Sequence, residues 1–164
     1  LRFARENDIP CLGICMGMQS MCIEFARNVL GYADANTTEI DPNTKHNVVD
    51  MMEEQKTILE KGASMRLGAY KCRLKEGTKV FDIYKKADIC ERHRHRYEFN
   101  NTYKKEFEQA GIVCSGINTD TDLVEIIELP SNKWYIGTQF HPEYRSTVLF
   151  PHPLFVDFIA NAKK

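Results

Sequence analysis

Several features that would assign this sequence to a familiar class are missing from it. No apolar run approaches the roughly 20 residues that a membrane-spanning helix needs, and the opening residues, LRFAREND, contain no apolar segment like that of a signal peptide. Opposite charges nearly cancel, with 22 Lys and Arg against 23 Asp and Glu, so no overall field attracts nucleic acid or an anionic membrane. We therefore predict a cytoplasmic protein that binds neither.

The six cysteines do not form a recognisable framework. None belongs to a C-x-x-C pair, and their spacing matches neither a zinc ribbon nor a small disulfide scaffold. We expect reduced thiols. The 164 residues, 43% of them hydrophobic, suffice for one sizeable core, and no repeat, low-complexity tract or linker divides them. We predict a single domain over residues 1–164.

A strand, a tight turn and a helix are predicted near the start of the chain. Residues 1–7 have helical character, and CLGI at residues 11–14 is typical of a short buried strand. In the following GMQSMCIEFARNVLG, apolar residues recur at helical spacing until Gly31, a usual stop signal.

The rest of the chain is predicted to alternate between strands and helices. We expect an irregular connection over residues 32–62, strands over 65–73 and 89–99, and a helix over 101–111 with Asn101 or Thr102 as N-cap and Gly111 as C-cap. Three strands follow within 112–117, 123–129 and 134–140, then an amphipathic helix over 152–164. This order predicts an α/β fold with a doubly wound central sheet that is mixed but mostly parallel, helices on both faces, and ligands bound at the C-terminal edge of a strand.

Cys15 occupies the centre of G-I-C-M-G, where the predicted strand turns into the helix. Such a turn holds a nucleophile in a strained conformation, and Gly13 and Gly17 would permit close approach of the backbone. The helix N-terminus favours thiolate over thiol, and the Met16 N–H would face a developing oxyanion. The alternative is a packing thiol, the usual role of a free cysteine.

A base and its orienting group are present in QFHPEY. In an extended segment His141 and Glu143 project to the same side, and Pro142 favours that conformation for His141. A carboxylate could then bind one imidazole nitrogen while the other faces the cysteine. A lone H-P-E would more often be a surface turn with a solvated glutamate, but its combination with the cysteine turn favours catalysis.

The motifs GICMGMQ and FHPE together resemble those of the class I (triad) glutamine amidotransferases. Five further segments, EFARNVLGYADANTTEID, MRLGAYKC, ERHRHRYEFN, LVEIIEL and QFHPEY, are similar to the glutaminase domains of the CTP synthase family. The resemblance covers essentially the whole chain. It implies a flavodoxin-like fold of which this sequence lacks the N-terminal portion, together with the amidoligase domain that precedes it in the family.

The resemblance also implies an activity. L-glutamine would be hydrolysed with Cys15 as nucleophile, His141 as general base and acid, and Glu143 as its orienting group, supplying ammonia for ATP-dependent amination of UTP to CTP. Six residues would bind glutamine: Met16, Gly17, Met18, Gln19, Glu39 and Arg96. The carboxylate of Glu39 would form charged hydrogen bonds with the α-ammonium of glutamine, and the guanidinium of Arg96 with its α-carboxylate. Without the resemblance, Glu39 would be an ordinary loop acid and ERHRHR a solvated basic strand or a modest phosphate patch.

Cofactors and partners follow from the same resemblance. We expect no cofactor in this domain, and ATP and Mg²⁺ in the amidoligase domain. We expect GTP to act as an allosteric activator, because the family associates the segment around Arg66 with the response to GTP. Homotetramers and filaments are expected assemblies. His93 and His95 could bind a metal ion, but no third ligand is evident, so we predict no metal site. Alternatives are the glutaminase of GMP or anthranilate synthesis, a γ-glutamyl hydrolase or peptidase, and a non-catalytic assembly module.

Overall fold

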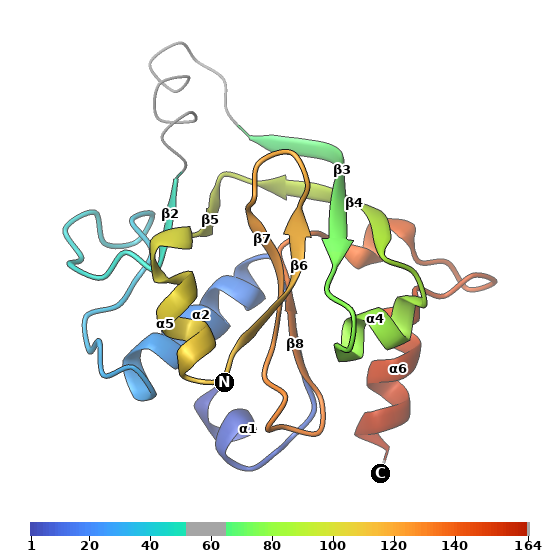
Figure 1. The fold of residues 1–164 in the computed structure, drawn as a ribbon, viewed down its shortest axis with the longest axis horizontal. Helices are drawn as coiled ribbons and strands as arrows, with labels where there is room; N and C mark the ends of the chain where they lie inside the picture. The colour runs from blue at the N-terminus through green and yellow to red at the C-terminus, as the bar shows by residue number, and fades with distance from the viewer. Residues whose placement is uncertain (52–64, 164) are drawn as a thin grey trace.

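The computed structural model describes residues 1–51 and 65–163. Within these ranges the strands form a six-stranded sheet, in the order β1-β8-β7-β6-β3-β4, and a two-stranded sheet of β2 and β5 (Figure 1). The strands are β1 Cys11–Ile14, β2 Val49–Met51, β3 Arg66–Leu74, β4 Asp88–His95, β5 Tyr97–Phe99, β6 Val113–Asn118, β7 Val124–Glu128 and β8 Tyr135–Thr138. The helices are α1 Arg2–Glu6, α2 Met16–Asn28, α4 Lys79–Tyr84, α5 Lys104–Gln109 and α6 Pro153–Ala162, with 3-10 turns η1 Asn101–Tyr103 and η2 Pro142–Arg145.

The large sheet is mixed, as predicted, but most of its strand pairs are antiparallel. β1 pairs with β8 in parallel, and the other neighbours in this sheet, β8-β7, β7-β6, β6-β3 and β3-β4, are antiparallel. The prediction of a mostly parallel sheet is therefore wrong for the described residues. The reason is connectivity: β6, β7 and β8 are joined by short turns, which return the chain antiparallel, whereas parallel neighbours need a long crossover.

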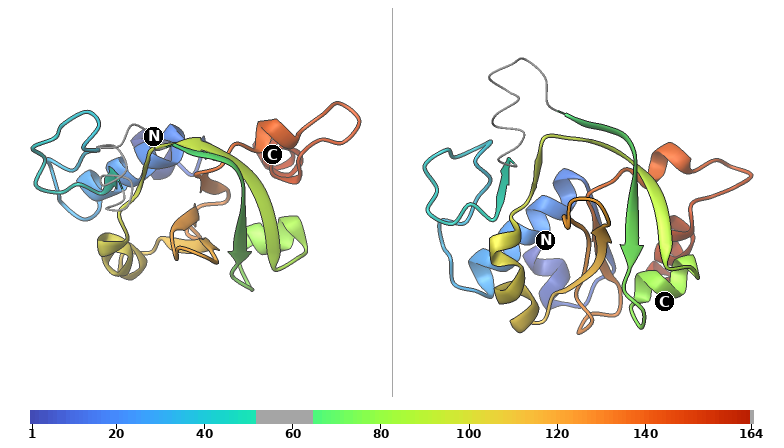
Figure 2. Two further views of the ribbon diagram at one scale, coloured as in Figure 1. Left: turned by 90° about the horizontal axis from the view of Figure 1, so that it is seen from above. Right: turned by 45° about the horizontal axis from the view of Figure 1, so that its top comes forward.

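Helices cover both faces of the sheet, as predicted (Figure 2). One hydrophobic cluster joins α2 and α5 to the sheet, and the other joins α4 and α6 to its opposite face. The side chains of adjacent strand residues alternate between the clusters: Ile126 packs in the second and Ile127 in the first. This period of two is what a strand buried on both faces requires.

Most predicted elements are present, with shifted boundaries. The strand expected over residues 89–99 bends at Arg96 and becomes β4 and β5. The helix expected over 101–111 starts as η1, and its N-cap is Asn100, whose side chain accepts a hydrogen bond from the Thr102 N–H. The predicted caps Asn101 and Thr102 are therefore wrong, because the amide two residues after Asn100 is within reach of its side chain. The C-cap is Ala110 rather than the predicted Gly111, which follows it with φ +111°.

The predicted irregular connection consists, as far as residue 51, of turns followed by the short β2, and its remainder lies outside the described residues. In the described ranges, no helix has both the length and the apolar character that crossing a membrane requires.

Candidate active site

Cys15 sits in the strained turn that its motif predicts. It is the N-cap of α2, directly after β1, with φ +52° and ψ −106°, a conformation that side-chain-bearing residues rarely adopt. Its N–H donates to the Thr138 carbonyl at 2.7 Å, and its own carbonyl accepts from the Gln19 N–H at 3.1 Å. The end of β8 thus holds the turn from one side and the first turn of α2 holds it from the other.

The two glycines beside Cys15 have different roles. A Cβ added to Gly13 would lie 2.7 Å from the Gly17 carbonyl carbon and 2.7 Å from the Met21 sulfur, so only glycine permits this approach of strand and helix. A Cβ added to Gly17 would meet nothing within 4 Å among the described residues. A close approach of the backbone was predicted at both glycines. The structure requires glycine only at Gly13, where the atoms approached are those of the Gly17 backbone.

A pocket of about 280 Å³ opens beside the Cys15 thiol. The described residues that line it are Cys15, Met16, Gln19, Glu39, Met65, Arg94, His95, Arg96 and Tyr97. Two residues predicted to bind glutamine, Glu39 and Arg96, thereby meet Cys15 although they come from distant segments. Glu39 is held by its N–H, which donates to the Thr37 hydroxyl at 3.2 Å. The side chain of Met18 instead packs in the core, fully buried, so only its backbone is available for the binding role predicted for it.

His141 and Glu143 form the predicted pair. They flank Pro142 where β8 leads into η2, and the Nδ1 of His141 lies 2.6 Å from a carboxylate oxygen of Glu143. The backbone N–H of His141 donates to the Arg92 carbonyl at 2.8 Å, which anchors the turn to β4. Because a carboxylate accepts, Nδ1 carries a proton, and in a neutral imidazole the lone pair is then on Nε2. In the described part of the chain Nε2 is buried without a hydrogen-bond partner.

The Cys15 thiol has a pKa above its ordinary value. Burial is the largest cause, and the charges of Glu143 and Glu39 add to it, while hydrogen bonds from the Met16 amide and the Gln139 side chain lower it. The expectation that the helix N-terminus favours the thiolate of Cys15 is therefore wrong, because the cost of desolvating the thiolate outweighs the hydrogen bond from the Met16 amide. Cys15 requires a proton acceptor to become a nucleophile.

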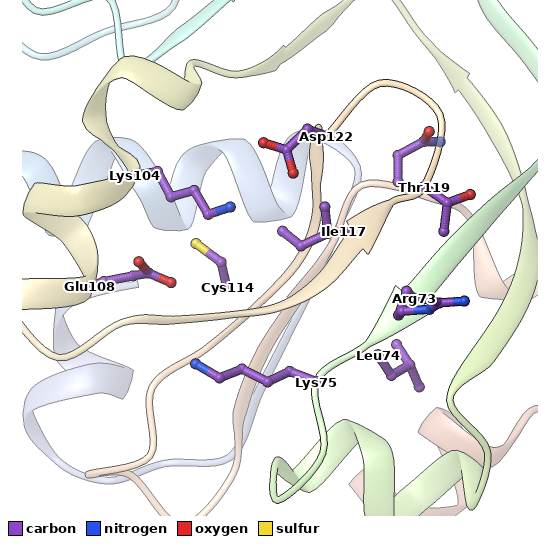
Figure 3. Close-up of a pocket in the computed structure, with 10 residues that line it drawn as sticks. Arg73, Leu74, Lys75, Lys104, Glu108, Cys114, Ile117, Thr119 and Asp122 are labelled. Carbon is purple, nitrogen blue, oxygen red and sulfur yellow. The ribbon is translucent and has the colours of Figure 1, made fainter.

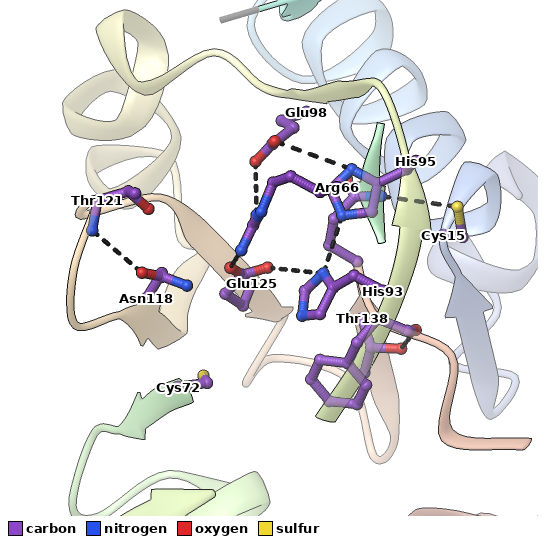
Figure 4. Close-up of polar contacts among 12 residues, drawn as sticks. Cys15, Arg66, Cys72, His93, His95, Glu98, Asn118, Thr121, Glu125 and Thr138 are labelled. Carbon is purple, nitrogen blue, oxygen red and sulfur yellow. Dashed lines mark hydrogen bonds and ion pairs between the residues drawn. The ribbon is translucent and has the colours of Figure 1, made fainter. Parts of the chain in front are cut away.

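A buried charge cluster behind the pocket was missed by sequence reasoning (Figure 4). Arg66 donates from Nη1 to Glu98 at 2.9 Å and from Nη2 to Glu125 at 2.7 Å. His93 and His95 lie beside them, hydrogen-bonded to each other at 2.8 Å. The alternation of β4 could have revealed part of this, since its even-numbered residues Asp88 to Arg94 are exposed and its odd-numbered ones buried. The acidic partners, on β5 and β7, were not recognisable.

Charge balance explains the pKa values in this cluster. Burial is the main cause that raises the pKa of Glu98 to about 7, and burial also raises the pKa of Glu125. Arg66 lowers both pKa values, but this one guanidinium serves two carboxylates and does not offset their burial. Burial, with Arg66 nearby, lowers the pKa of His93 to about 2 and that of His95 to about 3. Both histidines are therefore neutral. Arg66 is 7% exposed with its outer nitrogens occupied, which leaves little of it to contact a nucleotide.

A line of amides connects this cluster to the cysteine, and it too was not predicted as a unit. The Gln19 side-chain amide donates to the Tyr97 carbonyl at 2.7 Å and lies 3.3 Å from the Gln139 side-chain oxygen. The Gln139 amide in turn reaches the Cys15 sulfur at 3.7 Å. Gln19 was expected to touch substrate, whereas these contacts use its amide inside the protein.

A larger hollow, of about 550 Å³, lies between α5, β6 and the end of β3 (Figure 3). Its lining carries both signs of charge and includes Lys75, Lys104, Glu108 and Asp122. The thiol in its lining, Cys114, is buried with a pKa raised to about 12, and no histidine is among its described lining residues. It offers no nucleophile with a base.

The described residues contain no group of three or more His, Cys, Asp or Glu that could hold a metal ion. The spacing of His93 and His95 in the sequence made them candidate metal ligands. In the structure, Nδ1 of His93 and Nε2 of His95 are instead hydrogen-bonded to each other.

Comparison with known proteins places the chain in a family. Residues 1–161 match the family model described as "Glutamine amidotransferase class-I". A CTP synthase of Bacteroides fragilis is 66% identical over 161 residues, 98% of this chain and 30% of that protein. A CTP synthase of Aquifex aeolicus is 60% identical over 159 residues, 97% of this chain and again 30% of that protein. The chain thus spans about 30% of the length of these curated relatives.

Solved structures agree. A structure titled "Trypanosoma brucei CTPS - glutaminase domain with bound acivicin" superposes with a TM-score of 0.93 at 38% identity, covering 99% of this chain and 63% of that one. A putative GMP synthase protein from Thermoplasma acidophilum has a TM-score of 0.61 at 18% identity, covering 99% and 61%, and shares the fold alone. The chain belongs to the class I glutamine amidotransferase family, and within it resembles the glutaminase domain of CTP synthases.

Proposed function

We propose that this chain is the glutaminase domain of a CTP synthase and hydrolyses L-glutamine through Cys15, His141 and Glu143. The observation that carries the proposal is the pocket in which a strained, half-buried cysteine meets Glu39 and Arg96. These two exposed side chains supply one negative and one positive charge, which suits the α-ammonium and α-carboxylate of a free amino acid. A peptidase would have no need of that pair.

Binding of glutamine would direct its carboxamide toward the Cys15 sulfur. Glu39 would accept hydrogen bonds from the α-ammonium, and Arg96 would donate to the α-carboxylate. Because Cys15 has a raised pKa, the reaction starts from a thiol and an imidazole. His141 Nε2 takes the thiol proton as the sulfur attacks the carboxamide carbon.

The negative charge that develops on the carboxamide oxygen would face the Met16 N–H. His141 then gives its proton to the departing nitrogen, which releases ammonia and leaves a glutamyl thioester on Cys15. The same imidazole accepts a proton from water, which attacks the thioester and yields glutamate with the thiol restored. Glu143 keeps the Nδ1 proton in place throughout, so that Nε2 is the nitrogen that exchanges protons.

The fate of the ammonia is part of the same proposal. It would aminate UTP to CTP in an ATP-dependent reaction, with ATP, Mg²⁺ and UTP bound by the part of the relatives' length that this chain does not span. No cofactor is required for the hydrolysis steps above. Activation by GTP and assembly into homotetramers or filaments stay predictions.

Covalent labelling tests the proposal directly. Treating the protein with 6-diazo-5-oxo-L-norleucine, a glutamine-like electrophile, should give one adduct at Cys15 by mass spectrometry, suppressed by excess glutamine. Glu39→Ala and Arg96→Ala should slow labelling, whereas Arg73→Ala, which removes an exposed arginine paired with Asp88, should not. No adduct, or labelling that includes the exposed Cys90, would overturn the proposal and favour an assembly module.

The product assay separates the remaining alternatives. The natural full-length polypeptide should form CTP from UTP, ATP and glutamine, and Cys15→Ala should abolish this reaction with glutamine but retain it with ammonium chloride. Glutamine hydrolysis without CTP formation would point to the glutaminase of another amidotransferase.

A further inference from the structure

The predicted carboxylate-binding residue, Arg96, occupies a bend of a single residue. β4 ends at His95 and β5 begins at Tyr97, so Arg96 alone turns the chain from the large sheet to the small one. Its side chain is exposed in the pocket beside Cys15. The direction in which the guanidinium points depends on how firmly this bend is held, because Arg96 takes no part in the strand pairings of either sheet among the described residues.

The His95 imidazole spans that bend. Its Nδ1 lies 3.2 Å from the Tyr97 carbonyl oxygen, so the side chain before Arg96 contacts the backbone after it. A carbonyl can only accept, which places the proton on Nδ1. His95 Nε2 is then the acceptor for the Nδ1–H of His93, at 2.8 Å. Both nitrogens of His95 have partners, and its side chain is 3% exposed.

The groups that surround His95 keep it in this form. Arg66 faces it across the β3-β4 pair, directly opposite in register. Glu98 is 3.9 Å from its Nδ1, too far for a hydrogen bond, and is already bound to Arg66. A second proton on His95 would therefore meet a nearby cation and displace the donor of His93.

The same Tyr97 carbonyl also accepts from the Gln19 side-chain amide at 2.7 Å. Gln19 belongs to α2, the helix that Cys15 caps. Two donors thus hold one carbonyl, His95 from the sheet and Gln19 from the helix. The bend at Arg96 is fixed relative to Cys15 through this shared acceptor.

We propose that His95 is a positioning residue for glutamine: its Nδ1–H, bound to the Tyr97 carbonyl, fixes the bend from which Arg96 reaches the substrate α-carboxylate. This inference rests on the proposed glutaminase activity. His95 touches neither the thiol nor the carboxamide in this role, so its loss weakens substrate binding while the chemical steps continue.

Two amide substitutions separate the nitrogens of His95. In His95→Asn the side-chain NH₂ falls near the position of Nδ1 and can still donate to Tyr97. In His95→Gln the amide reaches toward the position of Nε2 and His93 instead. In the natural full-length polypeptide, glutaminase assays should give His95→Asn a KM close to that of the unmodified protein. His95→Gln should have a KM raised about tenfold, the factor for one hydrogen bond of ordinary strength, at a similar kcat.

A substrate without the α-carboxylate shows whether the effect passes through Arg96. With 4-aminobutanamide, His95→Gln and His95→Asn should have equal KM values, and in an Arg96→Ala background they should be equal for glutamine as well. Equal KM values of the two variants for glutamine, or a difference that persists with 4-aminobutanamide, would overturn the inference. If the unmodified protein hydrolyses no glutamine, the proposed function itself fails, which is a separate outcome.

Discussion

The imidazoles of His93 and His95 are hydrogen-bonded to each other inside the sheet, with Nδ1 of His93 2.8 Å from Nε2 of His95. The pair looks like two metal ligands in the sequence, yet the fold buries it beside an arginine that is itself bound to Glu98 and Glu125. Its neutral state and its contact with the Tyr97 carbonyl connect the interior of the sheet to the wall of the pocket beside Cys15. This cluster and the turn at Cys15 lead to four testable predictions.

Arg66→Met should destabilise the fold strongly. It leaves two buried carboxylates without their cation, a change that typically costs about 3–5 kcal/mol of unfolding free energy. The matched control is Arg73→Met on the same strand, where the arginine pairs with Asp88 in solvent; this variant should unfold at an unchanged urea concentration. Equal effects in the two variants, measured by urea unfolding, would contradict the structural role given to the cluster.

The stability that depends on His95 should vary with pH. Its pKa is about 3 when folded and about 6.5 when unfolded, so the unfolded chain binds the proton first on acidification. Stability is then fully present above pH 6.5 and declines toward pH 3, on the order of 1 kcal/mol per pH unit. Glu98, with a pKa raised to about 7, acts in the opposite direction between pH 4.5 and 7.

Subtracting a matched variant isolates the histidine. The difference in unfolding free energy between the unmodified protein and His95→Asn should decline from pH 6.5 to pH 3, because the carboxylates are common to both and largely cancel. Urea unfolding at half-unit pH steps measures it. A difference that does not change with pH would mean that His95 is not held in the neutral form.

Gly13→Ala should disturb the turn at Cys15, whereas Gly17→Ala should be accommodated. The added methyl group at Gly13 would lie 2.7 Å from backbone, and at Gly17 it would meet nothing within 4 Å among the described residues. Overpacking of this kind costs about 1–3 kcal/mol. Thermal unfolding should therefore show a lower midpoint for Gly13→Ala than for Gly17→Ala; the reverse order would show that the strand and helix are not in this close contact.

Cys15 should react slowly with iodoacetamide at neutral pH, because its pKa is raised by burial and alkylation requires the thiolate. The rate should increase as the pH rises above 8. Gln139→Leu removes the amide that contacts the sulfur at 3.7 Å and should shift the rate profile to still higher pH. Peptide mass spectrometry resolves Cys15 from the exposed Cys90. Rapid alkylation of Cys15 at pH 6 would show a lowered pKa instead.

Local signals in the sequence correctly predicted two pieces of geometry in the candidate site. The two glycines around Cys15 indicate a strained strand-to-helix turn, which the structure contains, and His141 with Glu143 two residues later indicates a hydrogen-bonded pair. Both depend on neighbours within a few residues, where backbone geometry alone decides which side chains meet. The alternation of β4 is equally local, and it divides the basic residues of this strand between an exposed and a buried face.

Contacts between residues distant in the sequence were harder to predict. That Glu39 and Arg96 line one pocket with Cys15 was inferred from family resemblance, since no local rule brings residues so distant in sequence together. The hydrophobic pattern of a strand buried on both faces does not record which way its neighbour runs. The short connections between β6, β7 and β8 do indicate antiparallel neighbours, whereas the pairings of β1 with β8 and of β3 with β6 join segments distant in the chain.

By itself, then, the sequence determined the turn at Cys15, the pairing of His141 with Glu143, and most of the order of strands and helices, α4 excepted, because each is specified by residues close together in the chain. Only the tertiary structure decided that the sheet is mostly antiparallel in the described residues, that His93 and His95 are buried and neutral beside Arg66, and that the Cys15 pKa is raised. These three depend on which distant segments exclude water from a group and which charges they bring to it.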